Sequence, residues 1–305
     1  MSLYGLFKGA GPSGFGYNST AADVAAGLDL TDKTYVITGC NSGLGAETMR
    51  VLADRGATVV GAARTETKAR RATDEVDGDA IPVVCELSEP DSVRKCVESV
   101  ADSVDAIDGL ICNAGIMALP ELNTKHGLEL QFLTNHVGHF ILTRGLIDSL
   151  ADDGRVVILS SRAHEQAPKG GIDYDNLDGS QGYDPLEFYG QSKFANLLCA
   201  KELQRRFGSD GRKAFALHPG VIDTNLARHM NSGIQVALKV VGPLFLKSIP
   251  QGAATETWAA AHPDAARHAG EYLADCNVAE PRKDAEDPES AQRLWEWSES
   301  WVDGR

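Results

Sequence analysis

The sequence lacks a surplus of positive charge, and this absence limits its partners. The 305-residue chain has 29 lysines and arginines against 43 aspartates and glutamates, a formal net charge of −14. A protein that binds nucleic acid needs a concentrated basic surface. We therefore expect no nucleic-acid partner.

Long apolar runs, a secretory leader and paired cysteines are also missing. The most apolar stretch, 234–246, is interrupted by Lys239 and Pro243 and is shorter than the ~20 residues that span a bilayer. The N-terminus has no basic stretch followed by an apolar core. The six cysteines are scattered without a CxxC pair, which favours buried, reduced thiols. We expect a cytoplasmic protein without a transmembrane segment.

What the chain does have is a regular alternation of strand-like and helical segments. The strand candidates are Tyr35–Thr38, Thr58–Ala62, Ile81–Cys85, Gly109–Cys112, Arg155–Ser160, Ala214–His218 and Glu271–Leu273. They are continuous apolar runs, which is typical of strands covered on both faces. The helical windows between them include Leu44–Arg55, Pro90–Val104, Lys125–Ser149 and Tyr189–Phe207. The pattern predicts an α/β fold: a Rossmann-type, doubly wound parallel sheet of about seven strands with helices on both faces.

The chain shows no internal repeat and no dividing linker, so we expect a single domain over residues 19–305. Residues 1–18, with five glycines and a proline, predict an irregular arm. A short helix should follow, capped by Ser19 or Thr20, with Asp23 at its positive end. Apolar residues at helical spacing from Ala291 to Val302 predict a helix that packs on the core or contacts a second subunit.

The first strand leads into the glycine-rich run Thr38-Gly39-Cys40-Asn41-Ser42-Gly43-Leu44-Gly45, and a helix follows. Glycines allow a tight turn and a close approach of the backbone to a pyrophosphate, and the free N–H groups at a helix start favour its charge. A tight turn without a ligand is the alternative. The strand before it and the helix after it favour a dinucleotide site.

The residue that would select between NAD(H) and NADP(H) stands at the end of the second strand. A carboxylate about 20 residues after the glycines would bind the ribose 2′-hydroxyl of NAD(H). Position 64, nineteen residues after Gly45, is Arg64, whose guanidinium suits a 2′-phosphate. Ser42 and Lys68 are further candidates for that phosphate. NADP(H) is favoured over NAD(H), with a solvated arginine as the alternative.

Further motifs follow the glycine turn in a fixed order. They are Cys112-Asn113-Ala114-Gly115, Asn135-His136-Val137-Gly138-His139-Phe140, Ser160-Ser161, Tyr189-Gly190-Gln191-Ser192-Lys193 and Pro219-Gly220. With the glycine turn as TGxxxGxG, this series resembles the short-chain dehydrogenase/reductase superfamily over about residues 20–300. The branch it resembles holds the retinol dehydrogenases and the WW-domain-containing oxidoreductase.

The resemblance implies which residues form the site. It implies a catalytic tetrad of Asn135, Ser161, Tyr189 and Lys193. The implied cofactor contacts are Gly39, Asn41, Ser42, Gly43, Leu44, Gly45, Glu86, Leu87, Asn113, Ala114, Gly115, Pro219, Gly220, Val221 and Thr224, besides Tyr189 and Lys193. Two positions depart from the family pattern: Glu86 stands where aspartate is usual, and Cys112 replaces the first asparagine of NNAG.

The tetrad residues suit hydride transfer to or from a carbonyl carbon. Tyr189 and Lys193 are four residues apart on an expected helix, so they share one face. An ammonium ~4 Å from the phenol would lower its pKa from ~10 by roughly three units before desolvation is subtracted. Ser161 would hold the substrate oxygen beside Tyr189, and the family gives Asn135 the role of anchoring a water. The histidines His136, His139, His164 and His218 lack metal-ligand spacing, so we expect no metal.

Two segments are candidates for the substrate side of the site. Residues 162–188 form a long polar excursion that predicts a loop along one wall of the pocket. The family places a substrate lid at about 225–249, and its apolar content favours a hydrophobic substrate, although an amphipathic packing helix fits equally. The sequence thus predicts an NADP(H)-dependent oxidoreductase of the carbonyl reductase type, acting on a CH–OH group. The alternative is a catalytically silent NADP(H)-binding regulator; a homo-oligomer is left open.

Overall fold

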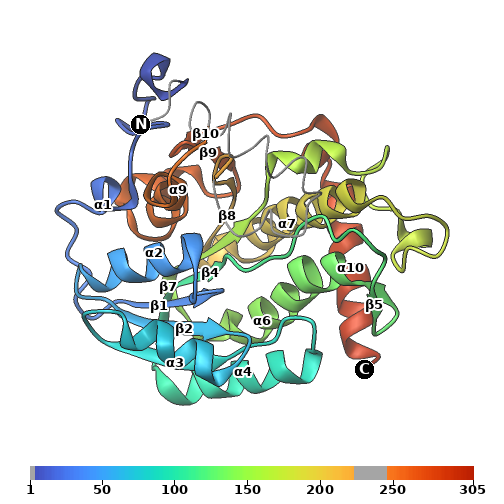
Figure 1. The fold of residues 1–305 in the computed structure, drawn as a ribbon, viewed down its shortest axis with the longest axis horizontal. Coiled ribbons are helices and arrows are strands. Elements are labelled where there is room, and N and C mark those ends of the chain that lie inside the picture. The colour runs from blue at the N-terminus through green and yellow to red at the C-terminus, as the bar shows by residue number, and fades with distance from the viewer. Residues whose placement is uncertain (1–3, 223–245) are drawn as a thin grey trace.

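The computed structural model describes residues 4–222 and 246–305. A central sheet runs through the molecule with helices on both faces (Figure 1). The strands are β1 (Thr34–Thr38), β2 (Thr58–Ala63), β3 (Ala80–Val84), β4 (Ile107–Cys112), β5 (Thr124–Lys125), β6 (Leu128–Glu129), β7 (Leu150–Leu159), β8 (Lys213–His218), β9 (Tyr272–Ala274) and β10 (Asn277–Val278). The α-helices are α1 (Ala21–Val24), α2 (Gly43–Ala53), α3 (Glu66–Asp74), α4 (Pro90–Ser103), α5 (Leu130–Phe132), α6 (Gly138–Leu146), α7 (Pro185–Phe207), α9 (Ile249–Ala261) and α10 (Pro288–Asp303).

The sheet confirms the doubly wound topology. Within the described residues its eight strands lie in the order β10-β9-β8-β7-β4-β1-β2-β3. All neighbours are parallel except β9 and β10, which form an antiparallel edge that the sequence pattern did not predict. The order reverses between β1 and β4, and parallel sheets bind ligands beyond the strands' carboxyl ends at such a reversal.

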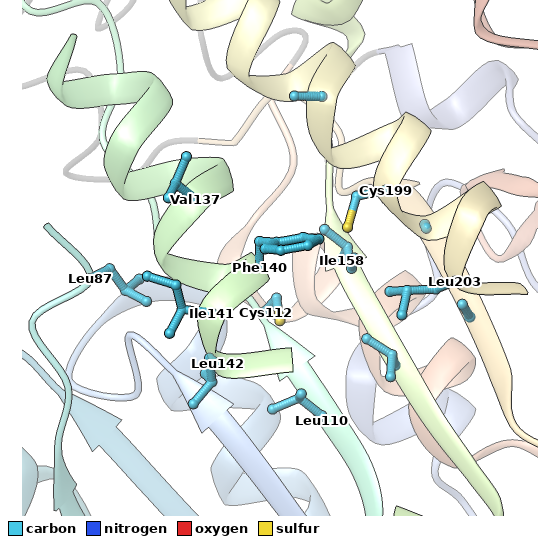
Figure 2. Close-up of a cluster of buried hydrophobic side chains, with 14 of the residues drawn as sticks. Leu87, Leu110, Cys112, Val137, Phe140, Ile141, Leu142, Ile158, Cys199 and Leu203 are labelled. Carbon is cyan, nitrogen blue, oxygen red and sulfur yellow. The ribbon is translucent and has the colours of Figure 1, made fainter. Parts of the chain in front are cut away.

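Each central strand supplies side chains to two separate cores, which explains the continuous apolar runs. In β1, Val36 packs into one core, while Tyr35 and Ile37 pack into the other. The first core lies under α4, α6, α7 and α10, and the second under α1, α2, α3 and α9. Figure 2 shows part of the first core, where Phe140 of α6 lies beside Ile158 of β7 and Cys199 of α7.

The helix expected over Lys125–Ser149 is wrong at its start. Lys125–Glu129 belongs to the β5–β6 hairpin, whose turn residues His126 and Gly127 have φ angles of 52° and 76°. Two consecutive positive φ values suit a two-residue hairpin turn. The rest is α5, a π-helix over Leu133–Val137, α6 and a final 3-10 turn.

The N-terminal arm is mainly irregular, with one 3-10 turn at Tyr4–Phe7 and a bridge between Ala10 and Gly16. The short helix after it is α1, and Thr20 and Asp23 form a reciprocal capping box. At the other end, α10 packs against α7, with Ala291, Leu294 and Trp295 in the first core. Packing on the core, one of the two roles expected for this helix, is therefore observed.

Of the expected lid, residues 225–245 lie outside the described part of the chain, and so does Thr224. Residues 246–249 lead into α9. Among residues 4–222 and 246–305, no helix combines the length and apolarity needed to cross a membrane.

Candidate functional site

The glycine turn between β1 and α2 has the backbone that its sequence predicts. Gly39 and Gly43 have positive φ angles of 72° and 62°, a conformation that costs glycine little. A Cβ on Gly45 would stand 2.4 Å from Asn113 Nδ2 and 2.7 Å from Gly39 O. Ser42 precedes α2 but its side chain makes no capping hydrogen bond. The first N–H groups of α2 therefore have no side-chain cap from Ser42 and suit an anion.

The turn after β4 is bonded directly to the glycine turn. Asn113 Nδ2 donates to Thr38 O at 2.8 Å, and Ala114 N–H donates to Thr38 Oγ1 at 3.0 Å. Cys112, the departure from NNAG, is fully buried, and burial raises its thiol pKa to about 12. It therefore packs as a neutral side chain and leaves the Asn113 bond intact.

Arg64 and Glu86 follow neighbouring strands and lie close together. Arg64 comes directly after β2, and its Nε is 3.9 Å from Glu86 Oε2. Glu86 Oε1 accepts hydrogen bonds from Ser88 N–H at 3.2 Å and Ser88 Oγ at 3.0 Å. The Arg64 side chain is 55% exposed, so the contact with Glu86 is a weak, solvated one. The Arg64 guanidinium therefore remains accessible to solvent at the end of β2, the strand next to β1, from which the glycine turn follows. Leu87, next in the chain, is buried against Gly138.

Tyr189 and Lys193 lie on one face of α7, as their spacing predicts, and both are buried. Lys193 Nζ donates to Leu159 O at 2.9 Å and lies 5.8 Å from the centre of the Tyr189 ring. Ser161 stands two residues after the end of β7 at Leu159; its hydroxyl hydrogen-bonds Tyr189 and accepts from Ala163 N–H at 3.2 Å. The phenol, the serine hydroxyl and the ammonium thus converge on one edge of the sheet.

The net pKa of Tyr189 is raised, not lowered, because desolvation, which the expectation left unsubtracted, is the largest effect on it. Burial raises the pKa of Tyr189 to about 12, and the hydrogen bond from Ser161 opposes this shift only in part. Burial also lowers the pKa of Lys193 to about 8. Both shifts favour the neutral forms, because desolvation penalises charge more than the neighbouring groups compensate. Tyr189 therefore holds its proton at neutral pH, which suits an acid.

Asn135 reaches this edge from the π-helix before α6. Its Oδ1 accepts from Ile116 N–H at 2.8 Å, and its Nδ2 donates to Ile116 O and Ser192 Oγ, each at 2.9 Å. A Cβ on Gly115 would stand 3.2 Å from Asn135 Oδ1 and 3.4 Å from Lys193 Nζ. Through these hydrogen bonds the Asn135 side chain joins Ile116, in the segment after β4, to Ser192 on α7.

The histidines at positions 136, 139, 164 and 218 each hydrogen-bond backbone or side-chain groups of the protein. His139 Nδ1 donates to Asn135 O at 2.9 Å, and its Nε2 is 2.9 Å from Thr38 Oγ1. Because burial lowers the pKa of His139 to about 4, the ring is neutral and Nε2 accepts from the threonine. His164 donates to Ser161 O at 2.6 Å and accepts from Arg282 N–H at 3.1 Å.

His136 and His218 complete the set. His136 lies 3.0 Å from Ser298 Oγ, and His218 Nδ1 accepts from Arg162 N–H at 3.3 Å. Over residues 4–222 and 246–305, no three His, Cys, Asp or Glu side chains gather in a way that could hold a metal ion.

The Pro219–Gly220 turn leaves the carboxyl end of β8. Gly220 has a φ of +99°, and Val221 is exposed. Lys247, which sequence reasoning did not single out, lies against this turn. Thr38, His139 and Ser192 were also missed as contacts of the site. All three stand inside the motifs quoted above, but their bonds join them to partners distant in the sequence, so the motifs alone did not indicate these contacts.

Comparisons with known proteins agree with this geometry. The family described as "short chain dehydrogenase" matches residues 33–175. The chain is 40% identical to "Short-chain dehydrogenase TIC 32 B, chloroplastic" of Brassica napus, over 99% of each chain. It is 36% identical to "Retinol dehydrogenase 13" of Homo sapiens, over 87% of this chain and 83% of that protein.

Two solved structures show the same fold. One, a putative uncharacterized protein from Mycobacterium Paratuberculosis, is 36% identical and aligns with a TM-score of 0.75 over 94% of this chain and 98% of its own. The second, blue fluorescent protein from a metagenomic library in complex with NADPH, is 26% identical with a TM-score of 0.65, over 81% and 97%. The chain belongs to the short-chain dehydrogenase/reductase family of nicotinamide-dependent oxidoreductases, in the branch of the retinol dehydrogenases.

Proposed function

We propose that this protein is an NADP(H)-dependent oxidoreductase that interconverts a hydrophobic carbonyl compound and its alcohol. The observation that carries the proposal is the convergence of Tyr189, Ser161 and Lys193 next to the turn after β4, which is itself bonded to the glycine turn. The retinol dehydrogenase relatives support a CH–OH substrate. The exposed aliphatic side chains of Val221 and Leu186, near the site, are compatible with an apolar substrate.

The residues at the glycine turn fit a nicotinamide dinucleotide. No atom lies within 4 Å of where a Cβ on Gly43 would stand, so the space at the start of α2 is open, and the N-terminus of this helix favours a pyrophosphate. Arg64 would bind the 2′-phosphate; its exposed guanidinium at the end of β2 supports NADP(H) over NAD(H). Asn113, Ala114 and Gly115 would line the cofactor from the next strand, and the Pro219–Val221 segment would border its nicotinamide end.

In this proposal the cofactor supplies or accepts the hydride, and the protein handles the proton. Tyr189 donates the phenol proton to the substrate oxygen during reduction, and Ser161 holds that oxygen by a second hydrogen bond. Lys193 stabilises the negative charge that develops on the phenol oxygen as its proton leaves. Asn135 positions Lys193 and the segment after β4 through Ser192 and Ile116.

A substrate panel tests the proposal. Purified protein is mixed with hydrophobic aldehydes and ketones and with NADPH or NADH, and oxidation of the reduced cofactor is followed. We expect turnover that is faster with NADPH. Tight NADPH binding without turnover across the whole panel would instead favour the second candidate, a silent NADP(H)-binding regulator of the same fold.

A further inference from the structure

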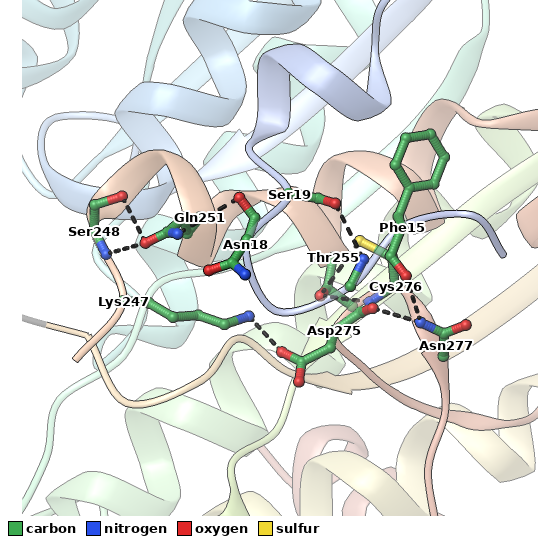
Figure 3. Close-up of polar contacts among 11 residues, drawn as sticks. Phe15, Asn18, Ser19, Lys247, Ser248, Gln251, Thr255, Asp275, Cys276 and Asn277 are labelled. Atoms are coloured by element: carbon green, nitrogen blue, oxygen red, sulfur yellow. Dashed lines mark hydrogen bonds and ion pairs between the residues drawn. The ribbon is translucent and has the colours of Figure 1, made fainter. Parts of the chain in front are cut away.

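Lys247 is a buried lysine in a polar cluster next to the Pro219–Gly220 turn, and the mechanism above does not use it. Only 2% of the residue is exposed. Its Nζ is 2.5 Å from Asp275 Oδ1 and 5.0 Å from the centre of the Tyr17 ring. Figure 3 shows the side chain pointing from the segment before α9 toward Asp275. The ion pair and the aromatic ring offset part of the desolvation of the ammonium.

The backbone and the stem of Lys247 both contact the turn that follows β8. Lys247 N–H donates to Val221 O at 2.9 Å, and Lys247 forms a parallel bridge with Ile222. A Cβ on Gly220 would stand 2.6 Å from Lys247 Cδ. The methylene stem therefore lies directly on Gly220 and adds to the backbone contacts that hold this turn in place.

Asp275 anchors the other end of this contact. It follows β9 in the left-handed region, with a φ of 51°. Its turn is held by two bonds, Asn277 Nδ2 to Asp275 O at 2.7 Å and Cys276 N–H to Thr255 Oγ1 at 3.1 Å. The pairing of His218 with Ala274 places this turn beside the end of β8.

Residues 220–222 also lie near the glycine turn, because Ile222 and Leu44 both contact Gly252 of α9. A Cβ on Gly252 of α9 would stand 2.4 Å from Ile222 Cδ1 and 2.7 Å from Leu44 Cδ2. Residues 220–222 thus lie between Lys247 on one side and, through α9, the start of α2 on the other. Among the described residues, the backbone bond from Lys247 N–H to Val221 O ties this segment to the chain before α9.

We propose that Lys247, paired with Asp275, is a positioning residue for the nicotinamide half of the cofactor, because it fixes the Gly220–Ile222 segment that borders that half. The inference rests on the proposed function, which places the nicotinamide beside this segment. It assigns Lys247 no contact with the reacting atoms. The adenosine half, which lies at Arg64 in the proposed function, is outside its influence.

The test compares a whole cofactor with its adenosine-side fragment. Dissociation constants of NADPH and of adenosine 2′,5′-bisphosphate are measured for the wild-type protein and for Lys247→Met, which keeps the length of the stem and removes the charge. NADPH should bind roughly tenfold more weakly, the loss expected for one charge-assisted contact. The fragment should bind as it does to the wild-type protein.

Lys201→Met is the matched control. Lys201 is also largely buried and ion-paired, with Nζ 2.7 Å from Glu286 Oε2, but it lies on α7 away from the Pro219–Gly220 turn. It should change neither constant. Asp275, the ion-pair partner, is 39% exposed. Asp275→Asn should weaken the binding of NADPH and leave that of the fragment unchanged, and it decides the question if Lys247→Met does not fold.

Unchanged NADPH affinity in both variants would overturn the inference. So would equal losses for NADPH and the fragment, because these would indicate a general structural defect. A wild-type protein that binds neither ligand would overturn the proposed function itself, and this outcome is visible before any variant is made.

Discussion

At the scale of single residues, protonation decides what the candidate site can do. Tyr189 is buried with its pKa raised to about 12, while burial lowers the pKa of Lys193 to about 8. Below about pH 8 the site therefore holds a neutral phenol beside a charged ammonium. This pair is ready to donate a proton, which is the step that carbonyl reduction needs.

The first prediction is a pH profile. As pH rises through about 8, Lys193 loses its charge and no longer stabilises the developing phenolate, so kcat/KM for reduction should fall. Oxidation of the alcohol begins with loss of the phenol proton and should rise with pH. Steady-state rates in both directions check this. Lys193→Arg, which stays charged, should remove the decline in reduction; a decline that persists in this variant would contradict the assignment.

The second prediction concerns Arg64. Arg64→Ala should weaken the binding of NADPH by roughly 10- to 100-fold, the value of a charge-assisted contact of about 1.5–3 kcal/mol. The affinity for NADH should be almost unchanged. Titration of both cofactors measures the ratio. Arg70→Ala is the control, since Arg70 is an exposed arginine paired with Glu66 on α3. Equal losses for both cofactors in Arg64→Ala would rule out the 2′-phosphate role.

At the scale of elements, the apolar strand segments and the strongly marked helices were predictable, and the two-residue strands of the β5–β6 hairpin were not. All seven predicted strands are present, because both faces of the sheet are covered and leave a continuous apolar signal. The β5–β6 hairpin has strands of two residues each, too short to show a period. Only His126-Gly127 could have indicated it, through the preference of such turns for positive φ.

The third prediction belongs to the junction of β1, α2 and the turn after β4. Gly45→Ala places a Cβ 2.4 Å from Asn113 Nδ2, so the Asn113–Thr38 bond must lengthen or break. We expect a loss of about 1–3 kcal/mol in the free energy of unfolding together with weaker NADPH binding. Thermal unfolding and titration check both. Gly9→Ala, where nothing lies within 4 Å, is the control. Wild-type stability and affinity in Gly45→Ala would show that the close packing is unimportant.

At the scale of the whole molecule, the candidate site was predictable because parallel strands end at a common edge. The glycine turn, Asn113, Ser161 and Pro219 each follow a strand, so their meeting follows from the fold class alone. Lys247 and Asp275 were not predictable, because they are paired across 28 residues and act on a turn reached through α9 and β9. Such contacts arise from tertiary packing, which leaves no periodic signal in the sequence.

In the proposed function the glycine turn binds the cofactor and Tyr189 of α7 donates the proton, so cofactor binding and turnover should respond differently to Tyr189→Phe. The variant removes the hydroxyl that donates the proton and leaves the glycine turn and Arg64 intact. In a single-turnover experiment with a substrate from the panel, wild-type protein should oxidise bound NADPH. Tyr189→Phe should bind NADPH with similar affinity and oxidise it at least about 10²-fold more slowly, the lower end of what a general acid contributes. Turnover by Tyr189→Phe at the wild-type rate would contradict the account.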